Sequence, residues 1–99
     1  MMAITDGTPK QNQWAEDIRS KFVFPESENN LLNKAIDVIK SIDCADFWIE
    51  HKDYDSVTLL RLLQAGKLKY KGSTMDVMMM EQDGTIKTGT MDYDGNINY

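Results

Sequence analysis

The fold is decided by the stretch Asp43-Cys44-Ala45-Asp46-Phe47-Trp48-Ile49-Glu50-His51-Lys52, which lies at the centre of a chain of 99 residues. Two adjacent aromatic side chains stand in it beside Ile49, and truncating Phe47 or Trp48 in a core would cost about 3–5 kcal/mol. A domain of this size has a net stability of only about 5–15 kcal/mol. We therefore expect Asp43 to cap a short helix that buries both aromatic residues.

Two longer helical patterns precede this stretch. The first predicts a helix over residues 9–22, because Thr8 is a suitable N-cap and Gln11 completes a capping box with it. The second predicts a helix over about residues 28–41 with Ser27 as its N-cap, and its apolar residues recur at helical spacing. The side chains expected to close the core against Phe47, Trp48 and Ile49 are Trp14, Ile18 and Leu32.

After these helices, the pattern changes from helical to strand-like at a glycine. A fourth helix is expected over about residues 56–65, and Gly66 stands where a left-handed C-cap belongs. Beyond it, polar and apolar residues alternate with period two, and Asp83-Gly84 is a strong signal for a two-residue hairpin. The expected strands cover residues 67–71, 74–82 and 85–91, with a turn at Gly72-Ser73 and a further strand at 96–99 after Asp94-Gly95.

Together the elements predict a single α+β domain over residues 1–99, with a helical part at about 8–66 and a β part at about 67–99. Three to four N-terminal helices are expected to pack against a C-terminal antiparallel β-hairpin or three-stranded meander, since a two-stranded hairpin is only marginally stable alone. Residues 1–7 are expected to form a loose arm. A chain of this length can bury one core without disulfide bonds or metal ions.

The composition predicts a soluble, cytoplasmic protein. The single cysteine, Cys44, cannot form an internal disulfide, which fits a reducing compartment. No apolar run approaches the ~18 residues of a membrane span, and the N-terminus lacks the pattern of a secretion signal. The net charge of −5 and the pI near 4.7 argue against a nucleic-acid partner, because such partners select basic surfaces.

The reactive side chains argue against an enzyme and against a bound cofactor or metal ion. Cys44 and His51 share one face of the expected helix but lie about 10 Å apart along its axis, too far for a thiolate–base pair. The two Asp-Gly pairs resemble parts of calcium loops, but the acidic residues that such loops need elsewhere are absent. No phosphate-binding glycine loop, nucleophile elbow or zinc-protease motif occurs either.

Two surfaces are candidates for binding a protein partner. The first is acidic, because residues 43–55 hold five acidic residues and one lysine. The second is rich in methionine, since four methionines lie in residues 75–80 and one core face cannot take all of them. The candidate residues are Asp46, Glu50 and Asp53 on the acidic surface, and Met78 and Met80 on an exposed strand face. Burial of both strand faces is the alternative for the methionines, and an exposed face also suits a homodimer.

A basic segment between these two regions offers a nucleic-acid alternative. Residues 56–72 contain four basic residues and no acidic one, which would suit contact with phosphate groups. Lysines on a strand also protect an exposed sheet edge, and this explanation is the simpler one. The residues concerned are Arg61, Lys67, Lys69, Tyr70 and Lys71.

Two stretches resemble a group of small uncharacterised proteins from bacteriophages and integrated elements of Gram-positive bacteria. They are Thr8-Pro9-Lys10-Gln11-Asn12-Gln13-Trp14-Ala15-Glu16-Asp17-Ile18-Arg19 and Ala45-Asp46-Phe47-Trp48-Ile49-Glu50-His51-Lys52, together about a fifth of the chain. In that group a Lys-Gln and a Trp-Ala-Glu precede an amphipathic helix, and an aromatic pair is followed by an apolar, an acidic and a basic residue. The resemblance implies a phage or mobile-element origin and supplies no activity.

The resulting expectation is a small non-enzymatic phage-type protein that acts in the host cytoplasm through a protein–protein interaction. Inhibition of a host nuclease or defence factor is one form of this expectation, because an acidic surface can occupy a basic nucleic-acid channel. The alternative is a nucleic-acid-associated accessory module that uses the Lys67–Lys71 strand.

Overall fold

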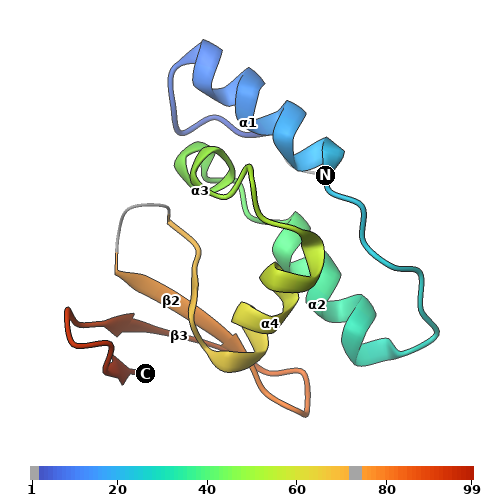
Figure 1. The fold of residues 1–99 in the computed structure, drawn as a ribbon, viewed down its shortest axis with the longest axis vertical. Helices are drawn as coiled ribbons and strands as arrows, with labels where there is room; N and C mark the ends of the chain where they lie inside the picture. The colour runs from blue at the N-terminus through green and yellow to red at the C-terminus, as the bar shows by residue number, and fades with distance from the viewer. Residues whose placement is uncertain (1–2, 72–74) are drawn as a thin grey trace.

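The computed structural model describes residues 3–71 and 75–99, which form four helices followed by a four-stranded antiparallel sheet in the order β1-β2-β3-β4 (Figure 1). The elements are α1 (Pro9–Lys21), α2 (Asn30–Lys40), α3 (Ala45–Glu50), α4 (Ser56–Ala65), β1 (Leu68–Lys69), β2 (Asp76–Met80), β3 (Ile86–Met91) and β4 (Ile97–Asn98). The predicted α+β class is confirmed, and the sheet has one strand more than the expected meander. The turn expected at Gly72-Ser73 and the expected strand start at Thr74 lie outside the described residues.

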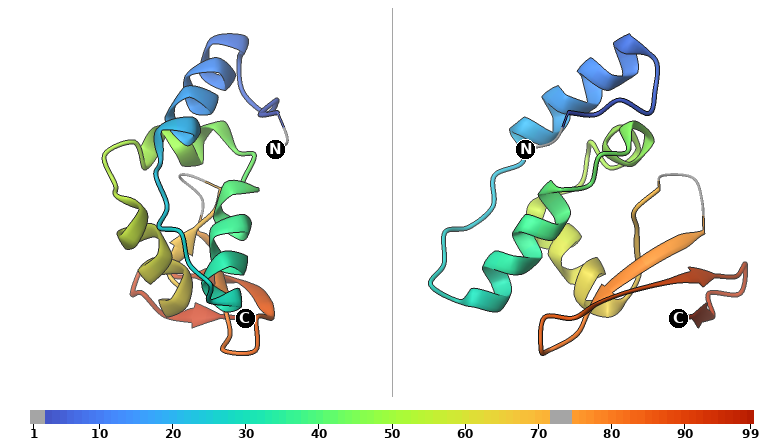
Figure 2. Two further views of the ribbon diagram at one scale, coloured as in Figure 1. Left: turned by 90° about the vertical axis from the view of Figure 1, so that its right-hand side faces the viewer. Right: turned by 180° about the vertical axis from the view of Figure 1, so that it is seen from behind.

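The first helix begins as its capping box predicts. The Thr8 hydroxyl accepts a hydrogen bond from the Gln11 backbone N–H at 3.2 Å, and the Gln11 side chain accepts one from the Thr8 N–H at 3.0 Å. The helix ends at Lys21, because Phe22 is already extended at φ −69° and ψ 122°. From there the chain runs to α2 along the outside of the molecule (Figure 2).

The predicted N-cap of α2 is wrong by two residues. Asn29, not Ser27, caps the helix, and its side-chain oxygen accepts hydrogen bonds from the N–H groups of Leu31 and Leu32 at 2.9 and 3.1 Å. The Ser27 hydroxyl instead accepts a hydrogen bond from the Asn29 N–H, at 3.0 Å. Asparagine and serine cap helices about equally well, so local sequence did not separate them.

The cap of α3 comes from the N-terminal arm rather than from Asp43. Cys44 occupies the N-cap position without a capping side-chain bond, and the Ala45 N–H donates to Asp6 Oδ1 at 2.8 Å. Over residues 3–7 the arm is therefore not loose, as we had expected. It also buries Ile4, whose backbone N–H donates to the Glu16 carboxylate at 3.3 Å.

The aromatic pair of α3 is at the centre of the core, as predicted. Phe47 and Trp48 are fully buried, and their rings meet edge to face at 5.0 Å between centroids. The indole N–H of Trp48 donates to the Ile42 carbonyl oxygen at 2.7 Å, so its polar atom is satisfied inside the core. Ile18 is buried against this pair, but the prediction for Trp14 is wrong because its side chain remains 48% exposed.

The sheet begins where α4 ends. Gly66 adopts the left-handed conformation at φ 74° and caps α4, as predicted. The register pairs Leu68 with Met78 and Ile86 with Met80, and this set faces the helices. Met78 and Met80 are thus buried in the core, and the expectation that they lie on an exposed face is wrong.

The opposite face of the sheet carries Val77 and Met79, and the C-terminal residue lies over it. The Tyr99 hydroxyl donates to the Gly66 carbonyl oxygen at 2.9 Å, which ties the end of the chain to the end of α4. Val77 is fully buried outside the main core cluster. Both faces of β2 therefore take part in packing.

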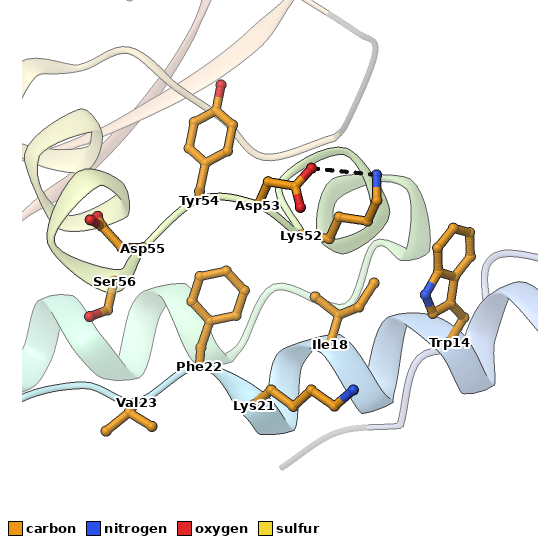
Figure 3. Close-up of a pocket in the computed structure, with 10 residues that line it drawn as sticks. All are labelled: Trp14, Ile18, Lys21, Phe22, Val23, Lys52, Asp53, Tyr54, Asp55 and Ser56. Carbon is orange, nitrogen blue, oxygen red and sulfur yellow. Dashed lines mark ion pairs between the residues drawn. The ribbon is translucent and has the colours of Figure 1, made fainter.

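The four helices lie at increasing distances from the sheet, with α4 nearest to it. α4 packs on β2 and β1, α2 packs on α4, and α1 packs on α3 at the end of the molecule farthest from the sheet (Figures 1 and 2). The C-terminal end of α1 consequently lies beside the turn that connects α3 to α4 (Figure 3).

Candidate functional site

A groove with a volume of about 470 Å³ opens between α1 and the α3–α4 turn (Figure 3). We call it the aromatic groove. One wall comes from the last two turns of α1 and the residues that follow, and the other comes from residues 52–56. The lining residues are Trp14, Ile18, Lys21, Phe22, Val23, Lys52, Asp53, Tyr54, Asp55 and Ser56.

Helical spacing gives the α1 wall its composition. Trp14, Ile18 and Lys21 recur at intervals of four and three residues, so they share one side of the helix. Ile18 is buried at the base, while Phe22 is half-buried and packs edge to face on Trp48 at 5.4 Å. Because the helix ends at Lys21, Val23 extends the same wall and is 83% exposed.

The opposite wall is positioned by a stack of rings that starts in the core. His51 lies against Phe47 at 4.3 Å between ring centroids, and Tyr54 meets His51 edge-on at 4.7 Å. His51 is buried at the C-cap of α3, where its Nδ1 bonds the Phe47 carbonyl oxygen at 2.7 Å. The Tyr54 N–H donates to the His51 carbonyl oxygen at 3.0 Å, which closes the turn. Tyr54 is thus positioned by His51, which itself packs on the buried ring of Phe47.

Two aromatic side chains of the groove lining keep a large part of their surface exposed to solvent. Trp14 is 48% exposed and Tyr54 is 44% exposed, and they stand on opposite walls (Figure 3). Neither the Trp14 indole N–H nor the Tyr54 hydroxyl makes a hydrogen bond to another residue in the described part of the chain. Such rings offer a large apolar area together with a free hydrogen-bonding tip, a combination common at interfaces.

Charge is divided unevenly between the two walls. The turn contributes Asp53 and Asp55 against Lys52, whose Nζ lies 3.9 Å from an Asp53 oxygen in an exposed ion pair. Hydrogen bonds from Thr58 hold the pKa of the Asp55 carboxyl below its usual value, and the nearby Arg61 charge adds to this effect. The turn therefore carries two carboxyl groups, and the lowered pKa favours the ionised form of the Asp55 carboxyl.

Of the acidic residues predicted as partner-binding candidates, one lies in the groove. Asp53 is on its rim, whereas Asp46 and Glu50 are exposed one turn apart on α3. The sequence reasoning missed Tyr54, Phe22 and Val23. An aromatic residue between two aspartates, in a turn that should be solvated, was the available signal for Tyr54.

The basic residues proposed for nucleic-acid contact do not form one surface. Lys71 pairs with Asp76 at 3.6 Å and lies 5.5 Å above the Tyr70 ring. Tyr70 packs against the core, whereas Lys69 points to the other face of the sheet. Arg61 is exposed on α4 and Lys67 is exposed just after it.

Cys44 and His51 are not placed as a thiolate–base pair. Cys44 and His51 occupy opposite ends of α3, so the histidine cannot act as its base. Burial raises the pKa of the Cys44 thiol, and the neighbouring Asp6 carboxylate adds to the rise. Within residues 3–71 and 75–99, no group of three histidine, cysteine or acidic residues is placed to hold a metal ion.

The fold defines the chain as an α+β protein, and no described helix is long and apolar enough to cross a membrane. Comparison of the chain with protein-family models, with curated proteins and with solved structures gives no match.

Proposed function

We propose that this protein is a non-enzymatic interaction module that binds an apolar segment of a protein partner in the aromatic groove. The observation that supports this proposal is the pair Trp14 and Tyr54, half exposed on opposite walls of a hollow of about 470 Å³, with polar atoms that bond no other residue in the described part of the chain. Aromatic side chains of this kind carry much of the binding energy at protein interfaces. A host nuclease or defence factor inhibited by this binding is the narrower form of the proposal.

The nucleic-acid alternative is not taken further, because its basic residues lie on different faces and Lys71 is paired with Asp76. Among the predicted interaction residues, Asp53 is retained because it borders the groove. Met78 and Met80 are dropped because they are buried.

Affinity capture from host lysate, followed by mass spectrometry, tests the proposal when groove variants are included. Trp14→Ala and Tyr54→Ala should each lose the captured partner, while both should keep a cooperative unfolding transition because these side chains are half exposed. Tyr93→Ala is the matched control, since Tyr93 is fully exposed between β3 and β4. Capture of the same partner by wild type and by the Trp14→Ala/Tyr54→Ala double variant would contradict the proposal.

A further inference from the structure

We infer that the segment bound by the aromatic groove is cationic: a peptide with one large apolar side chain and an arginine close to it. This inference rests on the proposed function and adds the chemistry of the partner. The apolar side chain would lie against Trp14, Ile18 and Phe22, and the guanidinium group against the Asp53-Tyr54-Asp55 turn.

The turn has the chemistry that recognises arginine. Tyr54 follows Asp53 and precedes Asp55 in the sequence, and all three residues line the groove. A guanidinium group stacks on aromatic faces and binds carboxylates through paired N–H groups, which an ammonium group does less well. Tyr54 is 44% exposed and is fixed from behind by His51, so its ring is available without rearrangement of the turn.

The charge distribution of the rest of the chain also favours a positively charged partner. Residues 43–55 carry a net charge of −4, and the chain as a whole carries −5. Asp46 and Glu50 are exposed on α3 outside the groove lining and contribute to this negative charge. The C-terminal ends of α1 and α3 also meet the groove, and the carbonyl groups of helix ends attract cations.

Lys21 and Lys52 equal Asp53 and Asp55 in number, so the lining residues carry no formal net charge and the preference for a cation depends on where the charges lie. Lys52 lies 3.9 Å from Asp53, but an exposed pair of this length is readily exchanged for a better-placed guanidinium group. Lys21 is exposed on the α1 wall, across the groove from the acidic turn (Figure 3). The acidic wall and the apolar wall are therefore distinct, which suits a segment with an apolar and a basic side.

A random peptide library displayed on phage tests the inference, with selection on the wild-type protein and counter-selection on the Trp14→Ala/Tyr54→Ala variant. The enriched sequences should combine an aromatic or aliphatic residue with a nearby arginine. An enriched peptide and its Arg→Gln analogue are then titrated against the protein by tryptophan fluorescence. Trp48 is buried and Trp14 is half exposed, so a change in emission reports on the groove.

Asp53→Asn and Asp55→Asn remove charge at nearly constant shape, and asparagine keeps the N-cap that Asp55 gives to α4. The double substitution should weaken the arginine peptide by about five- to tenfold and leave the Gln analogue unchanged. Asp94→Asn, in the turn before β4, is the control and should change neither affinity.

The possible failures can be told apart. If groove-dependent peptides are selected but lack basic residues, or bind the double Asn variant as tightly as wild type, the inference is wrong and the proposed function stands. If no wild-type binder survives counter-selection on the groove variant, the proposed function fails with the inference. A dimer in light scattering that Trp14→Ala dissociates would show a second copy as the occupant and overturn the inference.

Discussion

Replacing Asp6 by alanine is expected to lower the free energy of unfolding by about 1 kcal/mol, the usual effect of losing a helix cap. Asp6 Oδ1 accepts a hydrogen bond from the Ala45 N–H at 2.8 Å, and Cys44 at the N-cap position offers no side-chain substitute. The N–H would be left without its partner in a partly buried place. For a domain of this size, the loss corresponds to a fall in Tm of about 4–8 °C.

Urea denaturation followed by circular dichroism measures this change, with two control variants. Asp6→Asn keeps an oxygen acceptor and should retain more than half of the lost stability. Asp94→Ala removes an exposed aspartate elsewhere and should be neutral. The reasoning is refuted if Asp6→Ala unfolds within about 0.3 kcal/mol of wild type, or if Asp6→Asn is as damaging as alanine, since charge rather than the hydrogen bond would then be responsible.

Three further predictions follow from the core, a backbone cap and the thiol. Trp48→Phe should cost about 2–4 kcal/mol in urea denaturation, because it opens a cavity and leaves the Ile42 carbonyl oxygen unpaired. Gly66→Ala should cost about 1–2 kcal/mol in the same assay, since φ is +74° and an added Cβ would collide with the Tyr99 hydroxyl. The folded state favours the neutral Cys44 thiol, so its contribution to stability is present at neutral pH and is lost as pH rises through the raised pKa, above 9.0. Unfolding measured between neutral and alkaline pH should show this loss in wild type and not in Cys44→Ala. Because the Asp6 carboxylate contributes to the raised pKa, Asp6→Asn should make the Cys44 thiol react with a thiol reagent at lower pH.

The features that the sequence predicted correctly depend on chemistry within a few residues. The capping box of Thr8 and Gln11 and the C-cap at Gly66 each satisfy backbone groups locally, so neighbouring residue types are sufficient to indicate them. A hairpin turn does lie at Asp83-Gly84, but the predicted two-residue loop is wrong. The Glu81 N–H bonds the Thr85 carbonyl oxygen at 2.8 Å, which leaves a loop of three residues, and of these only Gly84 is left-handed. The buried aromatic pair of α3 was predictable for a different reason. A chain this small cannot leave both rings in water and remain folded.

The features that were missed depend on contacts between distant segments. The cap of α3 comes from Asp6, 39 residues before Ala45, so no window around Asp43 contains it. Helical spacing placed Trp14 on the apolar side of α1, but the way α1 crosses α3 decides that Ile18 is covered and Trp14 is not. Alternation likewise separates Met78 from Met79 without indicating which of them faces the helices.

The position of α1 also has a consequence for hydrogen exchange. α1 packs mainly on α3 and is joined to α2 by an extended segment, so it can lift away while α2, α4 and the sheet keep their contacts. Its amide protons should then exchange through a partial opening of lower free energy than the global unfolding that controls β2. Since α1 forms one wall of the aromatic groove, an occupant of the groove must close this opening. Slower exchange confined to α1 would be the first sign of a bound partner, before any change in the rest of the molecule.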